Sequence, residues 1–203
     1  MINNEKNETD ISSTKMTNIK SNDIDEKEIN LILNSLTIEQ VISYISDQIV
    51  IILFENRNKS KANLKDTNDP LYSNKVPIIK IEDYFIRLAK FSKMEISTLI
   101  LTYIYIKRFI DKENFIIAFN NIFRLIISCS ILAIKFNEKR VFKNSFYAKI
   151  AGLQVEDLNN LEYNVFSRLN FNLRVLDKEF FDLISLIYKD ALWKKITYII
   201  FFY

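Results

Sequence analysis

The scarcity of glycine and proline limits, more than any other feature, what this chain can fold into. Glycine occurs once and proline twice in 203 residues. Tight turns and β-hairpins need residues that adopt positive φ angles or a fixed φ, so a sheet-rich fold would lack its turn residues. Hydrophobic residues, largely Ile, Leu and Phe, make up 49% of the chain, which is enough to bury a core. The sequence therefore predicts an all-α fold, organised as one domain with a flexible extension.

Changes in composition divide the chain into segments. The first thirty residues are rich in Asn, Ser, Thr and charge and cannot assemble a core. Thr37 followed by Gln40 is a capping-box pattern, and it predicts a helix over 38–55. The predicted segments are a disordered tail over 1–30, an N-terminal helix over 31–56, a polar loop over 57–76, a helical core over 77–175 and a C-terminal helical extension over 176–203.

Apolar residues at helical spacing predict the helices of the core. They are expected over 80–91 with a break near Ser92, over 95–110, over 119–136, over a short stretch ending at Gly152, and over 155–169. The helix over 119–136 is apolar on two opposite faces, so other helices must surround it. Its main stripe consists of Ile122, Leu125, Ile126, Cys129, Leu132, Ala133 and Phe136.

Two charged residues lie where apolar residues are expected. Lys135 is part of the apolar segment "SCSILAIKFNEK", and Glu162 completes a stripe otherwise made of Val155, Leu158, Val165 and Leu169. A buried carboxylate needs a cation or good donors. Either side chain alone could reach solvent at the edge of the core, but the pair indicates a shared role. Arg124 and Ser128 lie within about 40° of Lys135 around the helix axis, so this helix has a narrow polar edge where a partner could dock.

The absence of histidine argues against an enzyme. Without it, the common catalytic triads and the commonest metal ligand are missing, and the sequence contains no acid–base pair or phosphate-binding loop. The single cysteine, Cys129, has no disulfide partner and is expected in the core of a protein from a reducing compartment. We therefore expect no catalytic residues, no cofactor, no metal and no small-molecule substrate.

The ends of the chain and its charge bear on location and partners. The N-terminus shows no secretory signal, and apolar runs such as "YIIFFY" at 198–203 are far shorter than a membrane span. These observations predict a cytoplasmic or nuclear protein with no membrane partner. A net charge of +3 is too weak to indicate nucleic acid. The aromatic C-terminal residues are expected to pack back on the bundle, with partner binding as the alternative.

The run from Pro77 to Leu173 resembles the cyclin box, specifically that of the single-box P/U-type cyclins related to the yeast phosphate-response cyclin. The resemblance rests on five segments in order: "PIIKIEDYFIRLAKF", "LILTYIYIKRFI", "NIFRLIISCSILAIKF", "KNSFYAKIAGL" and "LNNLEYNVFSRLNFNL". It implies a compact five-helix bundle with a central third helix, preceded by an extra N-terminal helix. It also implies a non-catalytic regulatory subunit that binds and activates a cyclin-dependent protein kinase, in cell-cycle or cell-division control.

The resemblance also implies a kinase-binding site. In the family, a lysine late in the third helix and a glutamate in the fifth lie close together and contact the kinase, and the matching positions here are Lys135 and Glu162. The apolar positions beside them match Leu132, Phe136 and Phe166, which would form the hydrophobic part of the groove. The alternative for these three residues is packing in the core.

One departure from the family pattern and two other functions stay open. The family usually has an aspartate in the second helix, paired with the first-helix arginine, here Arg87. Lys107 stands at the aspartate position, so either Asp83 or another acid pairs with Arg87, or Arg87 points outward.

The other functions are a nucleic-acid-binding cyclin fold of the transcription-factor type and an interaction scaffold without kinase activation. The first of these would need a basic face and usually has a second copy of the fold, for which the 30 residues after 173 are too few.

Overall fold

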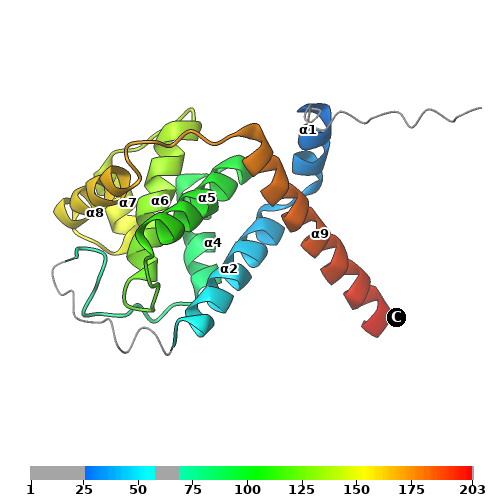
Figure 1. Cartoon of the computed structure of the whole chain (residues 1–203), viewed down its shortest axis with the longest axis horizontal. Coiled ribbons are helices and arrows are strands. Elements are labelled where there is room, and N and C mark those ends of the chain that lie inside the picture. The colour runs from blue at the N-terminus through cyan, green and yellow to red at the C-terminus, as the bar shows by residue number, and fades with distance from the viewer. Residues whose placement is uncertain (1–25, 58–68, 203) are drawn as a thin grey trace, which may run out of the picture.

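Eight helices and no strand make up the described part of the chain, residues 26–57 and 69–202 of this computed structural model (Figure 1). The all-α prediction is therefore confirmed. The helices are α1 (Glu26–Ser35), α2 (Ile38–Glu55), α4 (Ile81–Ser92), α5 (Ile96–Glu113), α6 (Ile122–Asn137), α7 (Asn144–Ala151), α8 (Val155–Arg168) and α9 (Asp177–Phe202). Helices α4 to α8 form the five-helix bundle that the resemblance implies, and α2 precedes it.

Helix α6 is the central helix, as predicted. Every residue from Ile122 to Ile134 except Arg124 is buried. Helices α5 and α8 pack against it, and α4 makes a smaller contact. Because neighbours cover it on several sides, its sequence is apolar around nearly the whole circumference. Phe136, the last residue of the predicted stripe, is the exception, since it is 56% exposed.

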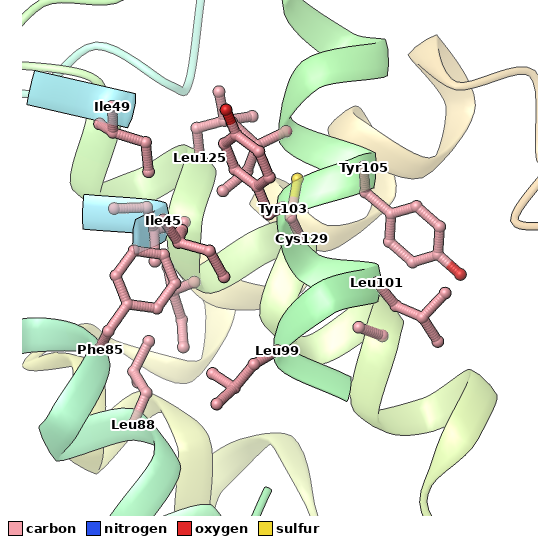
Figure 2. Close-up of a cluster of buried hydrophobic side chains, with 14 of the residues drawn as sticks. Ile45, Ile49, Phe85, Leu88, Leu99, Leu101, Tyr103, Tyr105, Leu125 and Cys129 are labelled. Carbon is pink, nitrogen blue, oxygen red and sulfur yellow. The ribbon is translucent and has the colours of Figure 1, made fainter. Parts of the chain in front are cut away.

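The hydrophobic core lies where α2, α4, α5 and α6 meet, as Figure 2 shows. Fully or almost fully buried side chains there include Ile45, Ile49, Phe85, Leu88, Leu99, Leu125 and Cys129. Burial raises the pKa of the Cys129 thiol, which therefore stays protonated and behaves as a small apolar side chain. The prediction that this cysteine belongs to the core is confirmed.

Three helices of the bundle end at a residue with left-handed backbone geometry. Gly152 ends α7 with φ 72°, as its position in the sequence predicts. Helices α4 and α5 end in the same way without glycine, at Lys93 with φ 54° and Asn114 with φ 47°. Asparagine tolerates this conformation better than other side chains, whereas lysine adopts it under strain. The break predicted near Ser92 therefore lies one residue later, at Lys93.

Replacing Lys93 by glycine should stabilise the protein by about 1 kcal/mol, because glycine removes the left-handed strain at the end of α4. Lys90→Gly is the matched control, since the same residue change inside α4 should cost about 1 kcal/mol. Urea unfolding followed by circular dichroism measures both free energies of unfolding. A destabilised Lys93→Gly variant would show that the left-handed residue carries no strain.

The N-terminal segments differ from the prediction. Helix α1 begins at Glu26, so residues 26–30 are helical and do not belong to a disordered tail. The predicted helix over 31–56 is two helices, separated at Thr37. Thr37 caps α2 as predicted. The Thr37 Oγ1 accepts from the Gln40 backbone N–H at 3.2 Å, and the Thr37 backbone N–H donates to Gln40 Oε1 at 2.8 Å. The rest of the predicted tail, and most of the predicted loop, lie outside the described residues.

The buried residues of helix α9 lie between Leu183 and Ala191. It contacts α1, α2 and α5, and Arg108 of α5 is hydrogen-bonded to Glu179 and to the Arg174 carbonyl. Further along the helix, the Lys194 Nζ lies 2.8 Å from Asp47 Oδ2 of α2. Beyond it, α9 runs away from the bundle (Figure 1), and Phe201 is 76% exposed. The expectation that the C-terminal residues pack back is therefore wrong for the last two turns.

Candidate functional site

Lys135 and Glu162 form an ion pair at the surface where α6 and α8 meet. The Lys135 Nζ lies 2.6 Å from Glu162 Oε1 and 2.8 Å from Oε2, so the ammonium binds both carboxylate oxygens. The carboxylate is the more buried partner, with 17% of its side chain exposed against 37% for the lysine. The structure thus joins the two residues that interrupt the apolar patterns. The Glu162 carboxylate, which lies in the apolar stripe of α8, is paired with a cation.

Asn144, at the start of α7, fixes the glutamate from a third helix. Its Nδ2 donates to Glu162 Oε2 at 2.7 Å and to Asn159 Oδ1 at 2.7 Å. The Glu162 carboxylate therefore accepts hydrogen bonds from Lys135 and from Asn144, and these two side chains hold it in place. The role of Asn144 could not be predicted from the sequence, because a single asparagine at the start of a helix does not indicate which distant residue it binds.

Within this ion pair, the lysine keeps a hydrogen-bond donor that the glutamate does not use. An ammonium has three N–H donors, and in the described part of the chain Lys135 Nζ donates only to the two oxygens of Glu162. One N–H thus remains for an acceptor outside this chain. Lys135 also lies in the last turn of α6, where the helix dipole favours a cation.

Glu138, which follows α6, joins the end of that helix to the start of α5. Its Oε1 accepts from the Glu95 backbone N–H at 2.8 Å and from Thr98 Oγ1 at 2.6 Å. A carboxylate at a helix N-terminus satisfies orphan donors and complements the dipole. Neighbouring Asn137 adds bonds to Ser97 and Thr98. These contacts hold the end of α6, and hence Lys135, in place.

Replacing Glu138 by alanine should lower the free energy of unfolding by about 1 kcal/mol, the usual cost of losing a helix N-cap. Glu138→Gln keeps an acceptor oxygen and should cost less than half as much. Thermal unfolding of the three proteins at neutral pH provides the comparison. An alanine variant as stable as the parent would show that the capping bonds are not needed.

The three apolar residues implied beside the pair have different surroundings. Leu132 is 3% exposed and packs in the core, so it supports the surface from beneath. Phe136 is 56% exposed and directly follows Lys135. Phe166 is partly buried, and its ring lies 5.0 Å from that of Phe171 at nearly a right angle. Tyr163 adds a third ring, 6.4 Å from Phe171, so the α8 side of the surface is aromatic.

The predicted polar edge of α6 is not an open docking strip. Ser128 is fully buried, and its Oγ donates to the Arg124 carbonyl at 2.7 Å within the same helix. The Arg124 Nη1 donates to the Pro70 carbonyl at 2.6 Å, which ties the preceding loop to α6. Only Lys135 extends from this edge to a charged partner. Arg124 and Ser128 thus serve the fold, and the prediction of a docking edge is wrong for these two residues.

The residues that depart from the family pattern also have defined positions. Arg87 is exposed on α4, and in the described residues it forms no ion pair, so it points outward. Lys107 is exposed on α5, beside a cleft against α9 that is also lined by Asp111, Glu179 and Asp182. Of the alternatives left open, the structure has the outward arginine. Lys107 lines the same cleft as Glu179 and Asp182 of α9.

The site has the features of a binding surface. Across the described residues, no group of His, Cys, Asp and Glu side chains could hold a metal ion. An anchored ion pair with a free donor, bordered by exposed aromatic rings, is typical of protein recognition.

Comparison with known proteins shows the class. The cyclin family model matches residues 6–173, so this chain belongs to the cyclin family and its five-helix bundle is a cyclin fold. The match also covers α1 and α2, which lie before the predicted box boundary at residue 77. Cyclins are generally non-catalytic regulatory proteins.

The curated relatives are P- and U-type cyclins, as the resemblance predicted. The chain is 33% identical to Cyclin-U2-1 of Arabidopsis thaliana over 144 residues, 70% of this chain and 65% of that protein. It is 30% identical to Cyclin-P3-1 of Oryza sativa subsp. japonica over 112 residues, 55% of this chain and 48% of that protein. It is 32% identical to Cyclin-U4-2 of Arabidopsis thaliana over 119 residues, 58% of this chain and 55% of that protein. The chain thus spans about half to two thirds of the length of these relatives.

Proposed function

We propose that this chain is a regulatory subunit that binds and activates a cyclin-dependent protein kinase, in cell-cycle or cell-division control. Membership of the cyclin family supports a regulatory, non-catalytic role. The proposal places the protein in a reducing compartment, the cytoplasm or the nucleus, in keeping with its single, free and buried cysteine.

The observation that carries the proposal is the anchored pair of Lys135 and Glu162. The lysine is held by both carboxylate oxygens and keeps one N–H for an acceptor on the kinase, such as a backbone carbonyl. Phe136 beside it offers an exposed apolar surface. Because Asn144 fixes the carboxylate, little side-chain entropy remains to be lost on binding.

Binding at this surface would act on the kinase through its mobile elements. A kinase is active only when its own Lys–Glu ion pair and its activation loop are correctly placed. A rigid surface that binds the helix carrying that glutamate favours the active position, in which the glutamate reaches the lysine. The cyclin supplies no reacting group, and its contribution is this shift of the kinase toward the active state.

The experiment is co-purification from cells of the source organism. The tagged protein is isolated with its partners, which are identified by mass spectrometry, and the eluate is assayed for protein kinase activity. We expect a cyclin-dependent kinase with the parent protein and none with a folded Lys135→Ala, Glu162→Ala variant.

The matched control is another ion pair of the same chain. Lys178 and Asp182 on α9 lie 3.0 Å apart and are more exposed, at 73% and 58% of their side chains. Replacing both by alanine should leave the kinase bound. Absence of any kinase with the parent protein in low salt would refute the proposal. Binding of duplex DNA that weakens steeply with added salt would instead favour the nucleic-acid alternative.

A further inference from the structure

The last turns of α9 carry an apolar stripe that no part of the described structure covers. It consists of Leu192, Trp193, Ile196, Ile199 and Ile200, which are between 41% and 69% exposed. Calculated at 100° per residue, these five side chains lie within about 120° around the helix axis. This is the width of the apolar face of an amphipathic helix.

The stripe faces away from the bundle. On the other side of α9, the Lys194 Nζ contacts Asp47 Oδ2 at 2.8 Å and Ser43 Oγ at 3.1 Å, both on α2. Figure 1 shows the C-terminal half of α9 running away from the other helices. Phe201 is 76% exposed on a side outside the stripe. The end of the helix is therefore apolar around much of its circumference.

The charges beside the stripe have one sign. Lys189 and Lys195 are both exposed. Lys195 lies about 40° outside one edge of the stripe, and Lys189 lies in line with the stripe, one turn before Leu192. The only acid among residues 189–202 is Asp190, which pairs with Lys194 at 3.0 Å on the α2 side. These lysines would repel the same lysines of a second copy. They complement an anionic surface.

We propose that this stripe binds an anionic lipid surface, with α9 lying in the plane of the membrane interface. Interfacial helices combine an apolar face containing Trp with Lys at its borders, where the long side chains reach the headgroups. Acyl chains also surround a helix end that is apolar on several sides, whereas a single protein helix would cover only the stripe. The inference goes beyond kinase binding and does not depend on it.

The inference concerns a helix that lies on a membrane and does not cross it. In the described residues, no single helix is both long and apolar enough to span a bilayer, and only the bent pair Lys27–Ser35 and Ile38–Glu55 passes a test of length and composition when taken together. The expectation of no membrane partner was based on the length of apolar runs. Length decides spanning, but it does not decide interfacial binding.

Trp193 makes the test direct, because it is the only tryptophan of the chain and lies in the stripe. The full chain is mixed with vesicles of two parts phosphatidylcholine and one part phosphatidylserine, and Trp193 fluorescence is recorded. We expect emission to shift to shorter wavelength and to be quenched by brominated acyl chains. Vesicles of phosphatidylcholine alone should bind about tenfold more weakly, and added salt should weaken binding to the mixed vesicles.

Variants assign the effect to the stripe. Ile196→Glu with Ile200→Glu should abolish vesicle binding. Lys189→Glu with Lys195→Glu should bind the mixed vesicles no more tightly than the parent protein binds vesicles of phosphatidylcholine alone. Phe91→Glu, at an apolar residue of α4 that is 54% exposed, is the control and should bind as the parent does. Circular dichroism confirms that each variant is folded.

Two results would overturn the inference. One is unchanged Trp193 emission with the mixed vesicles at low salt. The other is an emission shift without vesicles that grows with protein concentration, which would assign the stripe to contact between two copies.

Discussion

Replacing Lys135 by alanine is expected to weaken kinase binding about a hundredfold, the usual effect of truncating one partner of an interfacial charge pair. Two losses add up in this variant. The kinase loses the remaining ammonium donor, and Glu162, of which 17% is exposed, loses its cation at an interface that excludes water. Surface plasmon resonance with the purified kinase gives the dissociation constants. A change below about threefold would place the kinase contact elsewhere.

The double-mutant cycle separates these two losses. Glu162→Ala frees the lysine to move but leaves its charge, so its effect should be smaller than that of Lys135→Ala. The double variant should bind more tightly than Lys135→Ala but more weakly than the parent, because it no longer carries the unpaired carboxylate but still lacks the ammonium donor. Additive effects would instead mean that each side chain contacts the kinase independently. Thermal unfolding of each variant alone confirms that the fold persists.

The largest loss of stability from a polar substitution is expected at Arg168, the last residue of α8. Its Nε lies 2.8 Å from Glu113 Oε2 and its Nη1 lies 2.8 Å from Asp69 Oδ2. Its guanidinium also lies over the Phe109 ring, 4.5 Å from the centroid. One side chain thus joins α8, the end of α5 and the loop before α4.

Arg168→Ala should therefore lower the free energy of unfolding by about 2 kcal/mol, because two partly buried carboxylates lose their shared cation and a cation–π contact disappears. Arg168→Lys keeps the charge but not the fork of donors, so about half of the loss should remain. Urea unfolding at neutral pH measures both values. Lys178→Ala removes an exposed pair and should change stability by less than about 0.5 kcal/mol. An Arg168→Ala effect no larger than this would show that the network contributes nothing.

The helices of the bundle could be predicted from sequence because local patterns determine them. The cap at Thr37 and the left-handed end at Gly152 depend on neighbouring residues, and both lie where expected. The apolar circumference of α6 predicted its central position. The anomalous Lys135 and Glu162 could also be found, because a charge stands out against an apolar stripe.

The supporting contacts of the site could not be predicted in the same way. Glu138 binds the start of α5 across 43 residues, and Arg168 binds Asp69 across 99. Nothing near these residues in the sequence points to partners so far away. The polar edge of α6 was expected to be open to a partner. Helical spacing places Ser128 on this edge, but it does not reveal the hydrogen bond to the Arg124 carbonyl that the buried Ser128 makes within the helix.

The end of α9 shows that apolar composition alone does not predict whether a helix packs on the bundle. Apolar residues usually indicate burial, so packing on the bundle was the natural expectation for Ile196 and Phe201. The buried residues of α9 end at Ala191, and the axis of α9 then leads it away from the bundle. Helix direction depends on packing between distant elements, which the pattern of α9 alone does not contain.

Photo-crosslinking from position 136 tests the central claim most directly. A photoreactive phenylalanine analogue replaces Phe136, which is 56% exposed next to Lys135, and in a separate protein it replaces Phe91, which is 54% exposed on α4. After illumination in cell extract, crosslinked proteins are identified by mass spectrometry. The account predicts a cyclin-dependent kinase crosslinked from position 136 and not from position 91. A kinase captured only from position 91, or from neither position, would contradict it.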